Sequence, residues 1–133
     1  MILDRDKIQK INLFESLTNA KVKELIDEDK ITIIVDEGEI GKAIGKNGKN
    51  IKMFENMLHK KIKIVEFSKD PLKFTANFIH PAKAELIQLN NNNIEIKAKD
   101  RKTKGLLIGR ERKNLNELEK LLKEYFKLNI KII

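Results

Sequence analysis

The chain has 133 residues, of which 41% are hydrophobic and 36% charged, a composition typical of globular domains rather than of disordered chains. This length allows one mid-sized domain or two small ones. The absence of cysteine excludes disulfides and thiolate metal sites, and no stretch approaches the ~18 apolar residues of a membrane span. Charged residues near the N-terminus argue against a signal peptide, so we expect a cytoplasmic protein without membrane contact.

Basic residues outnumber acidic ones. The 28 Lys and Arg residues and 20 Asp and Glu residues give a net charge of +8 at pH 7 and an isoelectric point of about 9.6. Such a surplus favours a polyanionic partner bound through its phosphates. The surplus is uneven, because residues 1–67 carry a net charge of +1 and residues 68–133 carry +7.

The first half of the chain predicts six elements. In chain order they are a helix over 4–17, strands over 20–27 and 31–35, a helical turn over 40–44, an amphipathic helix over 51–58 and a strand over 61–67. The helices have apolar residues at three-and-four spacing, and the strands have β-branched residues at alternate positions. Each element therefore has an apolar face that should pack on a core.

The second half repeats this order after a very short linker at Ser68–Pro71. Asp70 suits an N-cap and Pro71 suits the first position of a helix, which His80 should end because it precedes a proline. The predicted elements are a helix over 71–79, strands over 82–89 and 94–99 joined by a turn over 90–93, a helical turn over 104–108, a helix over 115–126 and a strand over 128–133.

A repeat with a spacing of 64 residues relates the two halves. Gly41–Ile51 aligns with Gly105–Leu115, so that Gly, Ile, Gly, a basic residue and Lys-Asn recur in register. We therefore predict an α+β fold, an α/β sandwich, with tandem domains over 1–68 and 69–133. Each domain would run helix, strand, strand, helix, helix, strand, with a three-stranded sheet covered by helices.

The loop between the two helices of the first repeat carries the clearest chemical signal. Gly45 and Gly48 flank Lys46 and Asn47, which is the GXXG arrangement of a K-homology (KH) domain. Glycine lets a sugar-phosphate backbone approach closely, lysine neutralises phosphate, and the N-terminus of the following helix favours an anion. The predicted RNA-binding residues here are Gly41, Lys42, Ile44, Gly45, Lys46, Asn47, Gly48, Lys49 and Lys52. The residues predicted to line an aliphatic groove for the bases are Ile33, Val35, Ile40 and Ile44.

The second loop departs from this pattern. Arg112 stands where the second glycine belongs, and Glu111 places a carboxylate inside the loop. We expect weaker or altered RNA contact, made by side chains rather than by the main chain. The predicted contacts are Gly109, Arg110, Arg112 and Lys113.

Four longer stretches add a more specific resemblance. They are Ile11–Thr18, Glu39–Gly48, Lys60–Ser68 and Pro81-Ala82. With the loops, they resemble the archaeal form of the NusA family of transcription factors, a tandem of two type II KH domains, over nearly the whole chain. The resemblance implies binding of nascent single-stranded RNA beside RNA polymerase, with effects on elongation, pausing, termination or antitermination.

Two other functions would use the same features. One is an RNA-binding factor for ribosomal RNA maturation or ribosome assembly, which would contact pre-ribosomes instead of polymerase. The other is a KH-fold protein-interaction scaffold that has lost RNA binding, a reading favoured by Arg112 in place of glycine.

Catalysis is not expected, and neither is a metal site or a cofactor. The carboxylates of Asp36, Glu37 and Glu39 lie in a strand-to-helix turn, where they fit helix capping. His59 and His80 lack partners at the spacing of a zinc site or of a catalytic base. We expect a monomer that is not an enzyme.

Overall fold

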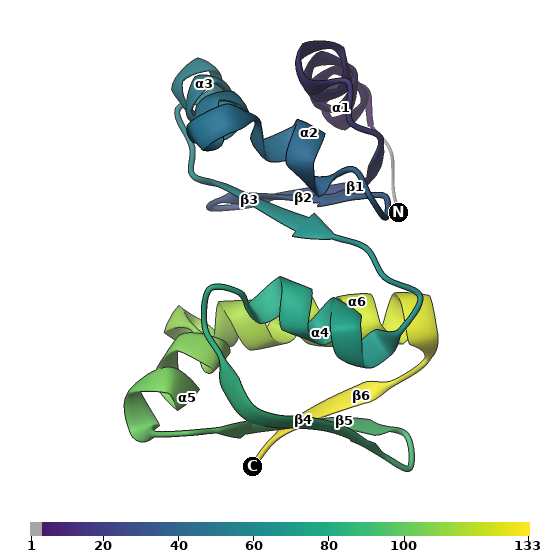
Figure 1. The fold of residues 1–133 in the computed structure, drawn as a ribbon, viewed down its shortest axis with the longest axis vertical. Coiled ribbons are helices and arrows are strands. Elements are labelled where there is room, and N and C mark those ends of the chain that lie inside the picture. The colour runs from purple at the N-terminus through teal and green to yellow at the C-terminus, as the bar shows by residue number, and fades with distance from the viewer. Residues whose placement is uncertain (1–3) are drawn as a thin grey trace. The chain divides into compact units, whose positions relative to one another are not determined.

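The computed structural model describes residues 4–133, and Met1–Leu3, which begin the predicted first domain, lie outside the described residues. The chain divides into two compact units, with the boundary between Phe67 and Ser68. In each unit the helices cover one face of a three-stranded sheet (Figure 1). The predicted fold class, an α+β sandwich with two tandem KH-type units, is confirmed.

The first unit contains α1 (Arg5–Thr18), β1 (Val22–Asp27), β2 (Ile31–Val35), α2 (Ile40–Ile44), the 3-10 turn η1 (Lys46–Gly48), α3 (Lys49–Leu58) and β3 (Ile62–Glu66). The second contains α4 (Pro71–Ile79), β4 (Ala84–Asn90), β5 (Asn93–Ala98), α5 (Arg101–Ile108), the 3-10 turn η2 (Arg110–Arg112), α6 (Lys113–Phe126) and β6 (Asn129–Ile132). In each sheet the middle strand pairs antiparallel with the strand before it and parallel with the last strand. Within residues 4–133, no helix combines the length and the apolar character that crossing a bilayer requires.

Side-chain caps explain the starts of α1 and α4. The Asp4 side chain accepts a hydrogen bond of 2.8 Å from the Lys7 N–H at the start of α1. At α4 the predicted cap is found, since the Asp70 side chain accepts from the Leu72 N–H at 3.0 Å and Pro71 follows it. These short-range signals are the reason that both helices begin within one residue of their predicted starts.

The start of α5 differs from the prediction. The helix begins at Arg101, three residues before the predicted helical turn over 104–108. The cause is Asp100, whose side chain accepts a hydrogen bond of 2.7 Å from the Thr103 N–H. This cap adds almost one turn to α5, and α2 in the first unit has no side-chain cap of this kind.

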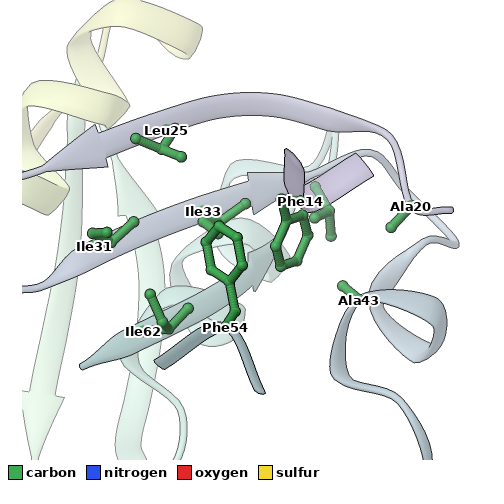
Figure 2. Packing of buried hydrophobic residues seen from close by; sticks show 9 residues of the cluster. Phe14, Ala20, Leu25, Ile31, Ile33, Ala43, Phe54 and Ile62 are labelled. Atoms are coloured by element: carbon green, nitrogen blue, oxygen red, sulfur yellow. The ribbon is translucent and has the colours of Figure 1, made fainter. Parts of the chain in front are cut away.

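The core of the first unit lies between the sheet and its helices. Phe14 of α1 and Phe54 of α3 meet edge to face with ring centroids 5.1 Å apart, and Figure 2 shows them against the strand that carries Ile31 and Ile33. Met57, on the same helix as Phe54, is 47% exposed.

Two residues predicted to line an RNA groove belong to this core. Ile33 and Val35 are both 0% exposed and form part of the buried cluster. The prediction that they contact bases is therefore wrong. Their strand, β2, is the middle strand of the sheet, and their side chains pack beneath the helices instead of reaching a ligand.

The second unit has its own aromatic contacts. Phe74 of α4 lies 5.7 Å from Tyr125 and 5.9 Å from Phe126, measured between ring centroids. Phe74 and Phe78 are buried, whereas Phe126 is only half-buried. Nucleic-acid bases therefore cannot stack on the rings of Phe74 and Phe78.

A charge cluster joins α1, β1 and the segment between α3 and β3. Asp27, at the end of β1, accepts hydrogen bonds from the ammonium groups of Lys10 and Lys60, the latter at 2.6 Å. Its side chain is only 12% exposed. Burial opposes ionisation of Asp27, but the hydrogen bonds from Lys10 and Lys60 outweigh it and hold the pKa of the carboxyl below its ordinary value.

Replacing Asp27 by Asn is expected to lower the free energy of unfolding by about 1–3 kcal/mol at pH 7, because charge-assisted hydrogen bonds to a shielded carboxylate are lost. Since the folded-state pKa lies below the unfolded value, this contribution is present above about pH 4 and disappears as the pH falls through the folded pKa. Denaturant unfolding at pH 7 and pH 3 measures it. Asp6→Asn is the control, because Asp6 pairs with the same Lys10 but its side chain is 68% exposed, so little change is expected. A difference between wild type and Asp27→Asn that stays the same at both pH values would contradict the assignment.

Candidate nucleic-acid interface

The first loop is a tight turn between α2 and α3. Gly45, Asn47 and Gly48 have φ values of +75°, +57° and +73°, and the Gly48 N–H donates to the Gly45 carbonyl at 3.1 Å. These left-handed conformations suit glycine and asparagine. The turn leads directly into Lys49, the first residue of α3, so the backbone N–H groups of the first turn of α3 point towards the loop.

The two glycines of this loop have different surroundings. A Cβ atom on Gly45 would lie 2.7 Å from the Asn50 amide nitrogen, a distance that real Cβ atoms do not reach. Apart from the adjoining residues of the chain, a Cβ atom on Gly48 would have no described atom within 4 Å. Gly45 is therefore constrained by the protein's own packing, whereas the space beside Gly48 is open to a ligand.

Exposed lysines surround the loop. Lys46, Lys49 and Lys52 are all exposed, and none of them forms an ion pair within residues 4–133. Lys49 and Lys52 lie on the first turn of α3, and Lys46 lies inside the loop. The helix N-terminus and these three cations together favour a phosphate at this end of α3.

Lys42, also predicted to contact RNA, is engaged within the protein. Its ammonium group lies 3.2 Å from the Glu39 carboxylate, which also accepts a hydrogen bond of 3.0 Å from the Lys21 N–H. The Lys21 hydrogen bond, followed by that of Lys42, holds the pKa of Glu39 below its ordinary value. The charge of Lys42 is thus partly compensated, which makes it the weakest of the four lysine candidates.

Two of the four residues predicted to line the aliphatic groove for the bases remain candidates. Ile40 is half-buried and packs against the core cluster, and Ile44 is half-buried immediately before Gly45. Of the predicted groove residues, these two keep surface that a base could contact. Gly41 is exposed and lies on the same helix.

The second loop has the same backbone geometry despite its different residues. Gly109, Glu111 and Arg112 have φ values of +78°, +56° and +60°, and the Arg112 N–H donates to the Gly109 carbonyl at 3.1 Å. Arg112 therefore adopts the left-handed conformation that Gly48 has in the first loop. The departure from the GXXG sequence changes the side chain at this position and leaves the path of the main chain unchanged.

The surface around the second loop combines cations with one apolar side chain. Arg110, Arg112 and Lys113 are exposed, and Gly109 is half-buried. Leu106, at the position that Lys42 has in the first unit, is 58% exposed. This loop can present guanidinium groups to a phosphate where the first loop presents open backbone.

Sequence reasoning missed one pair of residues. Asn50 donates a side-chain hydrogen bond of 2.8 Å to the Lys42 carbonyl, and Asn114 donates one of 3.1 Å to the Leu106 carbonyl. The sequence signal for this pair is the recurrence of Lys-Asn at the end of each loop of the repeat. Within residues 4–133, no group of three or more His, Cys, Asp or Glu side chains is arranged to hold a metal ion.

A family model described as the NusA-like second KH domain matches residues 7–70. Among curated proteins, the probable transcription termination protein NusA of Methanocaldococcus jannaschii is 32% identical over 136 residues, which cover 98% of this chain and 74% of that protein. The protein of the same name from Halococcus morrhuae is 28% identical over 125 residues, which cover 92% and 90% of the two chains.

Among solved structures, the crystal structure of APE1850 has a TM-score of 0.73 and 27% sequence identity to this chain. It covers 98% of this chain and 100% of its own. The family model is thus confined to residues 7–70, whereas the relatives and the solved structure extend over both units.

Proposed function

Because the chain belongs to the NusA family of KH-domain proteins, we propose that it is a transcription factor that binds single-stranded RNA. By binding nascent RNA it modulates elongation, pausing, termination or antitermination. RNA polymerase is the expected neighbour in this role, and the chain acts as a monomer without catalytic activity of its own.

The observation that carries the proposal is the open space beside Gly48 at the N-terminus of α3. A sugar-phosphate backbone can approach the main chain there, while the exposed Lys46 in the loop and the exposed Lys49 and Lys52 at the start of α3 supply positive charge. KH domains hold about four single-stranded nucleotides along such a loop, with the bases on an adjacent aliphatic surface. Ile44 is the residue best placed to contribute to that surface.

The second unit contributes a weaker contact with the same single-stranded RNA. Arg110, Arg112 and Lys113 hold phosphate through their side chains, because the Arg112 side chain stands where the first loop is open. Gly109 keeps the turn in the shape that presents these cations.

Fluorescence anisotropy of a labelled single-stranded RNA, measured at several salt concentrations, tests the proposal. Binding is expected to be micromolar or tighter and to prefer single-stranded RNA to duplex DNA of equal length. Each phosphate contact contributes about −0.7 to the slope of log K against log salt, so three lysines predict about −2, and a steeper slope indicates that the second loop also binds. Absence of binding would support the protein-interaction scaffold instead. RNA binding with co-purification of pre-ribosomes rather than polymerase would support the ribosomal RNA maturation factor.

A further inference from the structure

An asparagine side chain bridges the two helices at each loop. Asn50 lies in the first turn of α3, and its amide donates to the carbonyl of Lys42 in α2 at 2.8 Å. Asn114 lies in the first turn of α6 and donates to the carbonyl of Leu106 in α5 at 3.1 Å. The carbonyls in the last turn of a helix have no partner within the helix, so each asparagine satisfies an acceptor that would otherwise need water.

The same amide fills the space where the first glycine of the loop has no side chain. A Cβ atom would lie 2.7 Å from the amide nitrogen of Asn50 if placed on Gly45, and 2.7 Å from that of Asn114 if placed on Gly109. The two loops differ at the position of the second glycine, which is Gly48 in the first loop and Arg112 in the second. Both loops have the contact between the first glycine and the asparagine amide. The first glycine and the asparagine are therefore one packing unit.

We propose that Asn50 and Asn114 are positioning residues, which hold each loop in one conformation before a ligand arrives. The side-chain hydrogen bond ties the start of the second helix to the end of the first, across the turn formed by Gly45–Gly48 or Gly109–Arg112. A loop fixed in this way loses little conformational entropy when it binds. The inference deepens the proposed function, on which it rests for the identity of the ligand as single-stranded RNA.

The two loop glycines then have separate roles. Gly45 is required by the asparagine bridge and by its own positive φ, whereas Gly48 leaves space for the ligand. This division explains how the second loop keeps its backbone with arginine in place of the second glycine, since the Asn114 side chain contacts Gly109 and the Leu106 carbonyl.

Asn50→Ala is expected to weaken binding of single-stranded RNA about two- to tenfold, the equivalent of one lost hydrogen bond of about 0.5–1.5 kcal/mol. The salt dependence should keep its slope, because no charge is changed. Asn56→Ala is the matched control, since Asn56 is an exposed asparagine on the same helix. Affinities are compared at a temperature well below the unfolding transition of every variant, so that a loss of stability alone does not change them.

A second measurement needs no RNA. In the free 133-residue chain, Asn50→Ala should shift the backbone amide resonances of residues 45–48 in a 1H-15N NMR spectrum, and Asn56→Ala should not. Thermal unfolding of Gly45→Ala, Asn50→Ala and the double variant completes a mutant cycle. Gly45→Ala should lower the unfolding temperature less in the Asn50→Ala background, because the clash with the amide is gone while the strain of the positive φ remains.

The two measurements separate the inference from the proposed function. Unshifted loop resonances, or an additive mutant cycle, would overturn the positioning role even if the wild-type protein binds RNA. Shifted resonances and a coupled cycle in a protein that fails to bind RNA would support the positioning role and reject the proposed function. RNA affinity that falls equally in Asn56→Ala and Asn50→Ala would also overturn the inference.

Discussion

Reversing the charge at the tip of the first loop, by Lys46→Asp together with Asn47→Asp, is expected to lower the affinity for single-stranded RNA by more than about a hundredfold. The double substitution changes the charge of the loop by three units. Unit charges about 4 Å apart interact by about 1 kcal/mol in water, so a phosphate on the loop loses about 3 kcal/mol, or two powers of ten. Thermal unfolding should change little, because Lys46 is exposed and aspartate, like asparagine, tolerates the φ of +57° at position 47.

A matched control separates local from global charge. Lys61→Asp with Asn56→Asp makes the same chemical changes at exposed positions, of which Asn56 lies about 12 Å from Gly48 along the axis of α3 and Lys61 follows the C-terminal end of that helix. At about 0.1 M salt this distance reaches or exceeds the screening length of about 10 Å. Anisotropy titrations should therefore show a much smaller loss for the control. Equal losses in the two double variants would mean that RNA is held by net charge and not by this loop.

The second loop provides a comparison within the same molecule. Arg110→Asp with Arg112→Asp should reduce RNA affinity less than the change at the first loop, because the first loop alone combines cations with open main chain. A larger loss at the second loop would show that the second unit is the principal RNA site.

Placing a side chain at Gly48 is the second large expected effect. Gly48→Gln should weaken RNA binding at least about tenfold, because the new side chain occupies the space beside the loop where no described atom lies within 4 Å. Glutamine is neutral, so the loss reports close approach and not charge. The positive φ of +73° costs about 1–2 kcal/mol for a residue other than glycine, which lowers the unfolding temperature by several degrees.

Gly38→Gln is the control for that backbone cost. Gly38 has a φ of +84°, and a Cβ atom there also has no described atom within 4 Å, but it lies in the turn between β2 and α2. Thermal unfolding should shift by a similar amount in both variants, while anisotropy should show a loss of RNA affinity only for Gly48→Gln. If the two variants bind RNA equally well, the space beside Gly48 is not used by the ligand.

Most elements of the fold could be predicted because their signals are local. The apolar stripe of α3, the alternation in β3 and the Asp70-Pro71 start of α4 each act over a few residues and need no knowledge of distant contacts. The start of α5 was missed because Asp100 could equally have ended the preceding strand. Its hydrogen bond with the Thr103 N–H became visible only in the structure.

Some features of the candidate site could likewise be predicted from neighbouring residues, and others could not. The glycines and lysines of the first loop are contiguous in the chain, so their spacing alone pointed to a phosphate-binding turn. The burial of Ile33 and Val35 could not be predicted, because alternation in a strand does not tell which face the helices cover. The left-handed conformation of Arg112 could not be predicted either, since arginine in place of the second glycine favours a different backbone conformation.

By itself, the sequence determined the order of the elements, the repeat of 64 residues and the cationic loop residues, because periodicity, capping and charge are properties of neighbouring residues. Only the tertiary structure decided that Lys42 is held by Glu39, that the space beside Gly48 is open, and that Asn50 ties α3 to α2. The physical reason is that these properties depend on how separate segments pack, and packing sets the distances at which hydrogen bonds form and atoms collide.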